Sequence, residues 1–182
     1  MNNTIRREMI AARQGLAPEI AAELSRQITD RLRATDIYRQ AETVMIYSAV
    51  RGEVRLDGLF GDGKVFCWPY IAEKGRIIAL SPKNIEGWRV GKFGIPEPIP
   101  EKSLLIAPTQ IDLVICPCAA FDTDLHRLGM GGGYYDRFLP QCVNATFLAA
   151  AYELQRAENI QPQPWDVDMD CVVTEKNVYC RR

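Results

Sequence analysis

The chain has 182 residues, of which 47% are hydrophobic and 25% charged, the composition of an ordinary globular domain. We expect one domain over residues 1–182, with a net charge of −1 that excludes the basic field of a nucleic-acid-binding protein. No apolar run reaches membrane length, and we expect no signal peptide because the polar N-terminus lacks the apolar segment of one. The six cysteines show no metal-binding spacing, so we expect reduced thiols in a cytoplasmic protein.

Two helices are predicted at the N-terminal end. The first covers residues 3–14, where an apolar stripe is surrounded by arginines of the kind that usually form a solvated helix face. The stripe contains Ile5, Met9 and Ala12, and the arginines are Arg6, Arg7 and Arg13. The second helix begins at Pro18, which is tolerated in a first turn. Its apolar residues recur at every fourth position and predict a face packed on a core, namely Ile20, Leu24, Ile28 and Leu32.

The first strand is predicted over residues 43–48, an apolar and β-branched run typical of a parallel strand buried on both faces. Glu53 lies in the loop at the carboxyl end of this strand, where open α/β sheets bind ligands. The sequence alone favours a simpler role for Glu53, as the cap of a short helix over residues 56–60.

The next part of the chain is less regular. Short strands are predicted over residues 64–68, ended by Pro69, and over residues 76–80. Residues 81–110 contain five prolines and little periodicity, which predicts a long ordered loop. Aromatic residues on this loop, such as Phe93, either face a flat ligand or form a hydrophobic lid without one.

The second half of the chain alternates between strands and connecting segments. Strands are predicted over residues 112–117, 145–152 and 171–174, with an acidic loop over residues 162–168. This alternation predicts an α/β domain with a mainly parallel sheet. The lone histidine, His126, is expected to be a polar loop residue rather than a general acid or base.

Residues 127–137 carry the strongest functional signal, because four glycines fall within five positions there. Glycines let the backbone adopt φ > 0 and approach a ligand closely. A strand before this loop and a short helix over residues 134–139 after it predict an anion site. The glycine spacing matches neither phosphate-loop motif, so a tight turn that serves packing is the alternative. Arg127 and Arg137 favour phosphate binding, and Asp136 favours Mg²⁺ beside it.

Together these stretches resemble the 5-formyltetrahydrofolate cyclo-ligase family. The run from Arg127 to Arg137 looks like the signature of that family, and the resemblance extends over the whole chain. Supporting stretches are residues 52–54, 94–98, 117–122, 165–166 and 173–174, and the two N-terminal helices. The resemblance implies a three-layer α/β/α fold with a mainly parallel central sheet (NagB/RpiA/CoA transferase-like). It also implies a monomer that acts on small molecules, without nucleic-acid or membrane partners.

The activity implied by the resemblance is the ATP- and Mg²⁺-dependent cyclisation of 5-formyltetrahydrofolate to 5,10-methenyltetrahydrofolate, with release of ADP and phosphate. The γ-phosphoryl group of ATP is transferred to the formyl oxygen, and N10 then attacks the activated carbon. A nucleotide- or sugar-phosphate-binding α/β module without ligase activity is the alternative. The acidic set Glu53, Asp136 and Asp166 favours the ligase, because a simple phosphate binder does not need it.

The resemblance also implies four sets of site residues. Those for ATP are Asn2, Arg6, Arg127, Leu128, Gly129, Met130, Gly131, Gly132, Gly133, Tyr134 and Tyr135. Those for the folate are Ser48, Glu53, Phe93, Met130, Gly131, Gly132, Gly133 and Tyr134. Those for Mg²⁺ are Asp136 and Asp166, and the catalytic set is Arg127, Tyr134 and Asp136.

Two positions depart from the family pattern. Asn2 stands where the family usually has a lysine near the ATP phosphates, four residues before Arg6. Either Arg7 or another neighbour replaces that lysine, or the affinity for the nucleotide is lower. Leu125 stands where a glycine is usual, so leucine is strained there if the backbone needs φ > 0.

Overall fold

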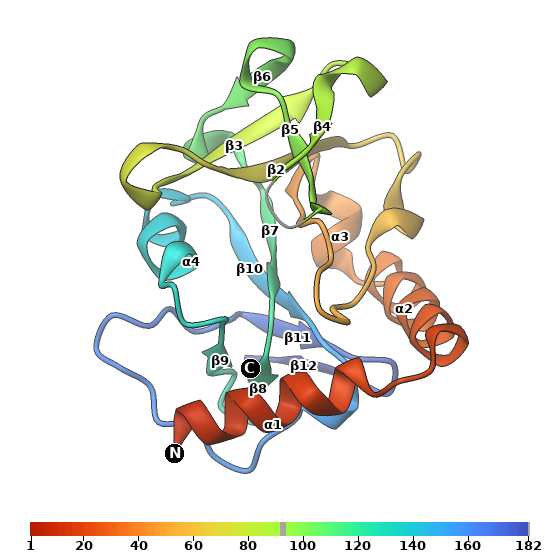
Figure 1. Cartoon of the computed structure of the whole chain (residues 1–182), viewed down its shortest axis with the longest axis vertical. Coiled ribbons are helices and arrows are strands. Elements are labelled where there is room, and N and C mark those ends of the chain that lie inside the picture. The colour runs from red at the N-terminus through yellow and green to blue at the C-terminus, as the bar shows by residue number, and fades with distance from the viewer. Residues whose placement is uncertain (92–93, 182) are drawn as a thin grey trace.

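Eight strands form one sheet within residues 1–91 and 94–181, which this computed structural model describes (Figure 1). The strands lie in the order β12-β11-β10-β7-β1-β2-β3-β6. Their bounds in the same order are Val178–Cys180, Cys171–Val173, Thr146–Ala150, Leu113–Pro117, Thr43–Met45, Val65–Ile71, Ile77–Pro82 and Ser103–Ile106. The neighbours β10, β7 and β1 are not consecutive in sequence, so crossover segments must join them.

The centre of the sheet is parallel and its margins are antiparallel. β1 pairs in parallel with β2 and β7, and β10 pairs in parallel with β7 and β11. β3, β6 and β12 join the sheet through antiparallel pairs. The prediction of an α/β fold with a mainly parallel sheet is therefore confirmed.

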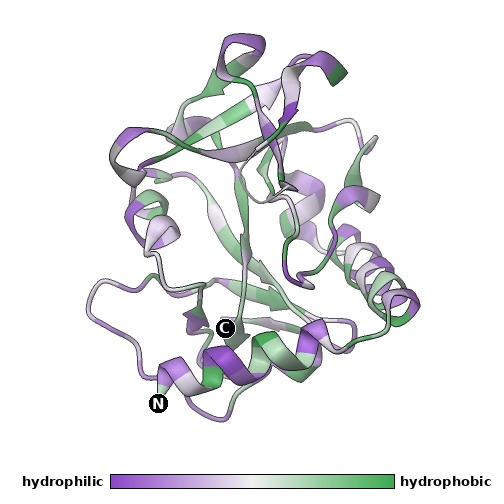
Figure 2. Ribbon diagram, viewed as in Figure 1, coloured by the Kyte–Doolittle hydropathy of each residue, from purple (hydrophilic) through white to green (hydrophobic). Residues whose placement is uncertain are grey.

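Both faces of the central strands are buried, which explains their nearly continuous apolar sequence. In β7, Leu113 and Ile115 face one core, whereas Val114 and Cys116 face the other. The first core is covered by α2 (Pro18–Arg33) and α3 (Asp36–Gln40), and the second by α4 (Tyr134–Phe138). Figure 2 shows these central strands as largely hydrophobic. The chain thus forms three layers, with the sheet in the middle.

The two predicted N-terminal helices are present, although their faces differ in part from the prediction. α1 spans Asn2–Gln14, and it packs on the segments that follow β7 and β10. In α2, Ile28 and Leu32 are buried as expected, whereas Ile20 is 52% exposed. No helix in the described part of the chain is long and apolar enough to span a membrane.

The region after β1 contains more strands than predicted. Pro69 does not end β2, which continues to Ile71. Beyond Cys67 this strand pairs with β3 but not with β1, so a residue without an N–H can be accommodated there. The expected loop over residues 81–110 includes strand β6 and a hairpin of β4 (Trp88–Val90) and β5 (Pro96–Pro98). Phe93 lies outside the described residues.

Short 3₁₀ turns complete the connections. They span Asp57–Leu59 (η1), Glu73–Gly75 (η2), Ile85–Gly87 (η3), Pro100–Lys102 (η5), Pro108–Gln110 (η6), Leu139–Gln141 (η7) and Glu153–Gln155 (η8). The short helix predicted over residues 56–60 corresponds to η1.

The sequence predicted a strand followed by the glycine loop. In the structure the loop does not follow β7 directly. A small two-stranded sheet of β8 (Ala120–Phe121) and β9 (Arg127–Leu128) intervenes, so the loop starts from the end of β9. The loop leads into α4, which has five residues. A helix this short has little macrodipole, so anion binding must rest on local groups.

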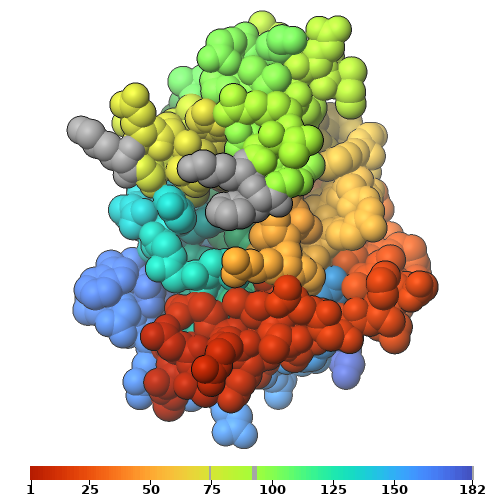
Figure 3. Space-filling model, viewed as in Figure 1, coloured from red at the N-terminus to blue at the C-terminus, as the bar shows by residue number. Residues whose placement is uncertain are grey.

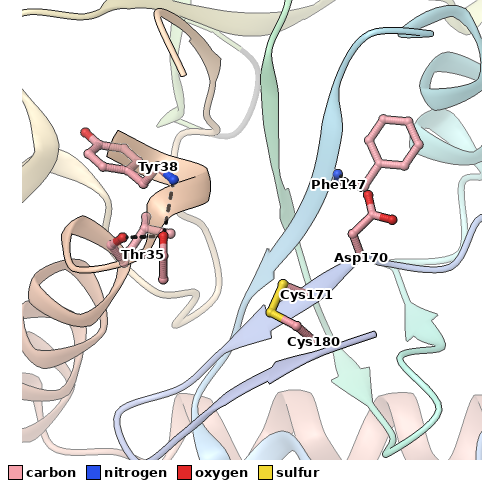
Figure 4. Close-up of a disulfide and its surroundings, with 7 residues drawn as sticks. Thr35, Tyr38, Phe147, Asp170, Cys171 and Cys180 are labelled. Atoms are coloured by element: carbon pink, nitrogen blue, oxygen red, sulfur yellow. Dashed lines mark hydrogen bonds between the residues drawn. A yellow bond between two sulfur atoms is a disulfide. The ribbon is translucent and has the colours of Figure 1, made fainter. Parts of the chain in front are cut away.

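The prediction of six reduced cysteines is wrong in one respect, because Cys171 and Cys180 form a disulfide (Figure 4). These residues lie opposite each other in the antiparallel pair of β11 and β12, which brings their sulfur atoms together. The remaining cysteines are free and buried, and they are Cys67, Cys116, Cys118 and Cys142.

Candidate active site

One cavity of about 920 Å³ gathers the predicted site residues from segments far apart in sequence. Its lining comes from the start of α1, the loop after β1, the β2–β3 and β4–β5 hairpins, the glycine loop and residues 163–166. Every described residue of the predicted sets lies in this lining. On the face shown in Figure 3, α1, the loop after β1 and α4 meet around the same region. A cavity of this size can hold two ligands of moderate size.

The glycine loop has the conformation of an anion site. Gly131 and Gly133 have φ values of 94° and 62°, which favour glycine. At Gly132 the limit is space, because an added Cβ would lie 2.5 Å from Cε2 of Tyr134. Within the described residues, the backbone N–H groups of residues 130–133 donate to no protein acceptor. The loop therefore offers several free donors to a ligand.

The N-terminal residues Asn2 and Arg6 reach the cavity from α1. Arg6 donates from Nε to the carbonyl oxygen of Gly129 at 2.7 Å, and its guanidinium lies beside Gly131. Asn2 donates from Nδ2 to the carbonyl oxygen of Gln161 and accepts from the N–H of the same residue. Asn2 thus holds the 161–166 loop. Arg7 is exposed and absent from the described lining, so it does not replace the usual lysine in this conformation.

Arg127 is almost completely buried beneath the glycine loop. Its Nη2 donates to Oδ1 of Asp136 at 3.0 Å, and its Nη1 donates to the carbonyl oxygen of Pro117 at 3.2 Å. Its Nε is buried without a partner among the described residues. Arg137 lies over the ring of Tyr134, at 5.4 Å from its centroid, and is not part of the described cavity lining. Arg127 therefore supplies positive charge beneath the loop, whereas Arg137 donates from Nη2 to the carbonyl oxygen of Gly132 at 3.1 Å from outside the described cavity lining.

Glu53 is not a helix cap, contrary to the simpler expectation. Its side chain is 4% exposed, and its Oε1 accepts from Nη2 of Arg13 at 3.3 Å. The N–H of Val50 donates to its Oε2 at 3.0 Å. Burial raises the pKa of the Glu53 carboxyl above its ordinary value of 4.5, and the charge of Arg13 acts in the opposite direction. The cavity thus contains a buried carboxylate with a fixed orientation.

Arg13 itself was missed by sequence reasoning, which placed it on a solvated helix face. The structure buries its side chain completely. A signal was present, because Arg13 follows Ile5 and Met9 at intervals of four on the inward stripe. Periodicity alone could not show that a charged residue would find a partner inside.

Two tyrosines lie side by side at the start of α4 but differ in exposure. Tyr134 is 40% exposed, and its ring approaches Gly75 at the tip of the β2–β3 hairpin. The hydroxyl of Tyr135 is buried and has no partner among the described residues. Burial raises the pKa of Tyr135 well above its ordinary value, so its hydroxyl stays protonated and can donate a hydrogen bond. Ser48 lies in the loop after β1, which ends at Met45 and not at residue 48 as predicted, and it donates from Oγ to the carbonyl oxygen of Pro96.

Asp136 from α4 and Asp166 from the 161–166 loop both line the cavity. Asp136 has one oxygen bonded to Arg127, and Oδ2 of Asp166 accepts from the N–H of Gln163. No cluster of three or more metal-binding side chains exists in the described ranges. This donor set fits Mg²⁺, which takes one or two carboxylates and completes its shell with water and phosphate.

The two residues before β9 have structural roles. Leu125 is buried and has a φ of 69°, which confirms that this position needs the left-handed region. Both the N–H and Nδ1 of His126 bond to the buried carboxylate of Asp122. His126 is not part of the described lining, in agreement with its predicted role as a polar loop residue.

Comparison with known proteins identifies the family to which this chain is similar. The family model described as the 5-formyltetrahydrofolate cyclo-ligase family matches residues 1–175. The chain is 30% identical over 139 residues to the 5-formyltetrahydrofolate cyclo-ligase of Haemophilus influenzae, covering 72% of this chain and 74% of that protein. It is 27% identical over 175 residues to the enzyme of the same name from Escherichia coli K12, covering 92% and 96%.

A solved structure agrees with these relatives. The NMR structure of Aquifex aeolicus 5,10-methenyltetrahydrofolate synthetase aligns with a TM-score of 0.87 at 30% identity. The alignment covers 98% of this chain and 92% of that one. The match therefore includes the sheet, the glycine loop and the segments that line the cavity. The chain belongs to the 5-formyltetrahydrofolate cyclo-ligase family.

Proposed function

We propose that this protein closes 5-formyltetrahydrofolate to 5,10-methenyltetrahydrofolate in the described cavity, using ATP and Mg²⁺ and releasing ADP and phosphate. The observation that carries the proposal is the presence of two unlike binding elements in one cavity. A loop with free backbone N–H donors faces the same space as the buried carboxylate of Glu53. The first element suits phosphates, and the second suits the paired N–H donors of a pterin ring.

The chemistry begins with transfer of the γ-phosphoryl group of ATP to the formyl oxygen, which is otherwise a poor leaving group. The N10 amine then attacks the activated formyl carbon, and the C–O bond breaks. The oxygen leaves with the phosphate, and N10 loses its proton. Such a reaction needs positioning and charge neutralisation more than covalent help from the protein.

The residues of the cavity divide this work. The N–H groups of Gly131, Gly132 and Gly133 bind phosphate oxygens together with Arg6. Arg127 adds positive charge beneath the loop, close enough to stabilise charge that develops during transfer. Tyr134 stacks on the flat ring of a ligand. The hydroxyl of Tyr135, which has no partner among the described residues, donates to the ligand that fills this part of the cavity.

Asp136 and Asp166 would hold the Mg²⁺ ion. When bound, the ion neutralises charge on the phosphates of ATP. Asp136 also keeps its bond to Arg127, so it connects the metal site to the positive charge beneath the loop. We expect residues 1–182 to act as one domain and as a monomer. We also expect small-molecule partners alone, without nucleic acid or membrane, and a cytoplasmic location. These four points remain predictions.

A spectrophotometric assay tests the proposal directly. Purified protein is mixed with 5-formyltetrahydrofolate, ATP and Mg²⁺, and the near-ultraviolet absorbance of the methenyl product is followed. We expect absorbance to grow only when all three components are present. Absence of growth, with ATP still bound by calorimetry, would favour a binding module without ligase activity.

A further inference from the structure

Arg13 is a buried cation that touches the site without lining the cavity. Its side chain is fully buried, although arginine is rarely found so deep in a protein. It lies in the last turn of α1, one residue before the end of the helix. A buried charge needs a paired charge and several hydrogen bonds, because the cost of removing it from water is large.

The guanidinium of Arg13 joins three segments that form the cavity. Its Nε donates to the carbonyl oxygen of Arg51 at 3.0 Å, and its Nη1 donates to that of Cys118 at 2.7 Å. Its Nη2 reaches Oε1 of Glu53 at 3.3 Å and lies 3.9 Å from Sδ of Met130 in the glycine loop. Glu53 is its ion-pair partner within the described residues. All three nitrogens of the planar fork are thus used.

The backbone around Glu53 is shaped to receive this side chain. Arg51 and Gly52 both have positive φ values, 49° and 73°, and form the turn that brings Glu53 back towards α1. An added Cβ at Gly52 would lie 3.1 Å from the carbonyl oxygen of Arg13. The turn therefore packs directly on the backbone of the helix that carries Arg13. This packing restrains the position of α1 relative to the loop after β1.

We propose that Arg13 is a positioning residue for the folate, which it affects by fixing the carboxylate of Glu53. The inference rests on the proposed function, in which Glu53 accepts hydrogen bonds from the pterin. Oε1 is held by Arg13 and Oε2 by the N–H of Val50. Each carboxylate oxygen can accept a second bond, so the orientation of the carboxylate decides where the pterin donors can be met.

The groups that face Glu53 also determine how its binding role depends on pH. The charged neighbours are Arg13 from α1 and Arg51 from the same loop. The neutral titratable neighbours are Tyr47, Tyr135 and Cys118, from the loop after β1, α4 and the segment after β7. Burial raises the pKa of Glu53, and Arg13 is the largest factor opposing this rise. Loss of Arg13 therefore raises the pKa further, and folate binding is lost as the pH falls through that higher value.

The test compares Arg13→Met and Arg13→Lys with wild type, measuring KM for 5-formyltetrahydrofolate and KM for ATP separately. For Arg13→Met we expect the KM for the folate to rise about tenfold or more, the effect of losing one charge-assisted hydrogen bond. We expect the KM for ATP to change by less than about threefold. The KM for the folate should rise less in Arg13→Lys than in Arg13→Met, because lysine keeps the positive charge but not the planar guanidinium group.

The pH profile and a stability control separate positioning from folding. In Arg13→Met, the rise in the KM for the folate at acidic pH should begin at a higher pH than in wild type. Leu32→Ala is the stability control, because it leaves a cavity in the core under α2. It should lower the unfolding temperature without altering either KM. Equal rises in both KM values, or an unchanged pH profile, would overturn the inference. If Arg13→Met does not fold, Arg13→Lys is judged by the same two readouts.

A Glu53→Gln variant separates this inference from the proposed function. If Arg13 acts through Glu53, combining Arg13→Lys with Glu53→Gln should raise the KM for the folate little beyond the Glu53→Gln value. An unchanged KM in Glu53→Gln alone would remove Glu53 from the folate site, and with it the proposed role of that residue. A raised KM in Glu53→Gln, with no effect of either Arg13 variant, would overturn only the inference about Arg13.

Discussion

The two walls of the cavity differ in how fully their polar groups are paired. On the wall formed by the loop after β1, Glu53 is bonded at both oxygens, and Ser48 is bonded to Pro96. On the wall formed by the glycine loop and α4, backbone N–H groups are free among the described residues. Nε of Arg127 and the hydroxyl of Tyr135 are buried on this wall, and neither has a partner within residues 1–91 and 94–181.

This difference indicates two ways of preparing a site for a ligand. Paired groups keep their orientation before the ligand arrives, so less order has to be imposed on binding. Buried groups without partners cost about 1–3 kcal/mol each, and native structures rarely keep them without a reason. We infer that the wall of the glycine loop is completed by its ligand, whereas the opposite wall is complete beforehand.

The largest expected loss of activity comes from Asp136→Asn, on the wall of the glycine loop. The change removes a negative charge beside the loop but keeps an oxygen that accepts from Nη2 of Arg127. We expect kcat/KM to fall by about 100-fold or more, as when one transition-state contact is lost, while the unfolding temperature stays close to wild type. Initial rates over a range of Mg²⁺ concentrations measure the effect. Full turnover at limiting Mg²⁺ would exclude a metal role for Asp136.

Asp168→Asn is the matched control for that change. Asp168 lies on the same acidic loop as Asp166, but it pairs with Arg181 and is not in the described lining of the main cavity. We expect rates close to wild type. If kcat/KM fell as much in Asp168→Asn as in Asp136→Asn, the activity would depend on the overall negative charge of this region and not on the position of Asp136.

Gly132→Ala tests whether the loop depends on the close approach of Tyr134. The new Cβ would lie 2.5 Å from Cε2 of Tyr134, so the ring must move and with it the surface offered to the ligands. We expect kcat/KM to fall by about 10- to 100-fold, as is usual for a displacement near 1 Å in an active site. Steady-state kinetics with each substrate varied in turn will show which one is affected.

Gly15→Ala is the control for Gly132→Ala, because an added Cβ there meets atoms no closer than 3.4 Å and the backbone is right-handed. We expect unchanged kinetics and equal or slightly higher stability. Kinetics of Gly132→Ala equal to those of Gly15→Ala would mean that the loop tolerates a side chain at its tip.

Tyr135→Phe sharpens the comparison between the two walls. Removal of a hydroxyl that has no partner in the described part of the chain should leave stability unchanged, or raise it by up to about 1 kcal/mol. If a ligand completes this wall, kcat/KM should fall by about 3- to 10-fold. Tyr47→Phe is the matched control, because that buried hydroxyl donates to the carbonyl oxygen of Val54 at 3.1 Å. We expect it to lose about 1 kcal/mol of stability. The reverse order of stabilities in urea unfolding would contradict the proposed difference.

The sequence predicted best those features that depend on local pattern. The apolar runs that became β1, β7 and β10 can be recognised because strands buried on both faces need apolar residues throughout. The glycine loop could be recognised because glycines at this density have few other uses. The described residues of the predicted site share one cavity because the carboxyl ends of neighbouring parallel strands lie at the same edge of the sheet.

The features that the sequence did not predict depend on partners that lie outside the local pattern of the chain. β6 is a strand only because β3 lies beside it, and its proline-rich surroundings concealed it. The disulfide of Cys171 and Cys180 required β12, which carries no strong pattern of its own. The burial of Arg13 required Glu53, 40 residues later. A hydrophobic pattern cannot reveal such pairs, because it reports the burial of each residue separately and not the identity of its partner; arginine and glutamate taken alone are more common on the surface.

The last prediction concerns a small difference between two variants of Leu125, where the chain keeps a side chain at a backbone position suited to glycine. Its φ of 69° costs about 1–2 kcal/mol for an L-residue, whereas burial of its side chain contributes about 2–5 kcal/mol. Leu125→Gly gains the first amount and loses the second, so we expect a net loss of about 1–3 kcal/mol. Leu125→Ala loses most of the burial and keeps the strain, so it should be less stable than Leu125→Gly by about 1 kcal/mol. That order is the reverse of the usual one for helices and strands, and urea unfolding of both variants measures it. Equal stability of the two variants would mean that the backbone relaxes out of the left-handed region.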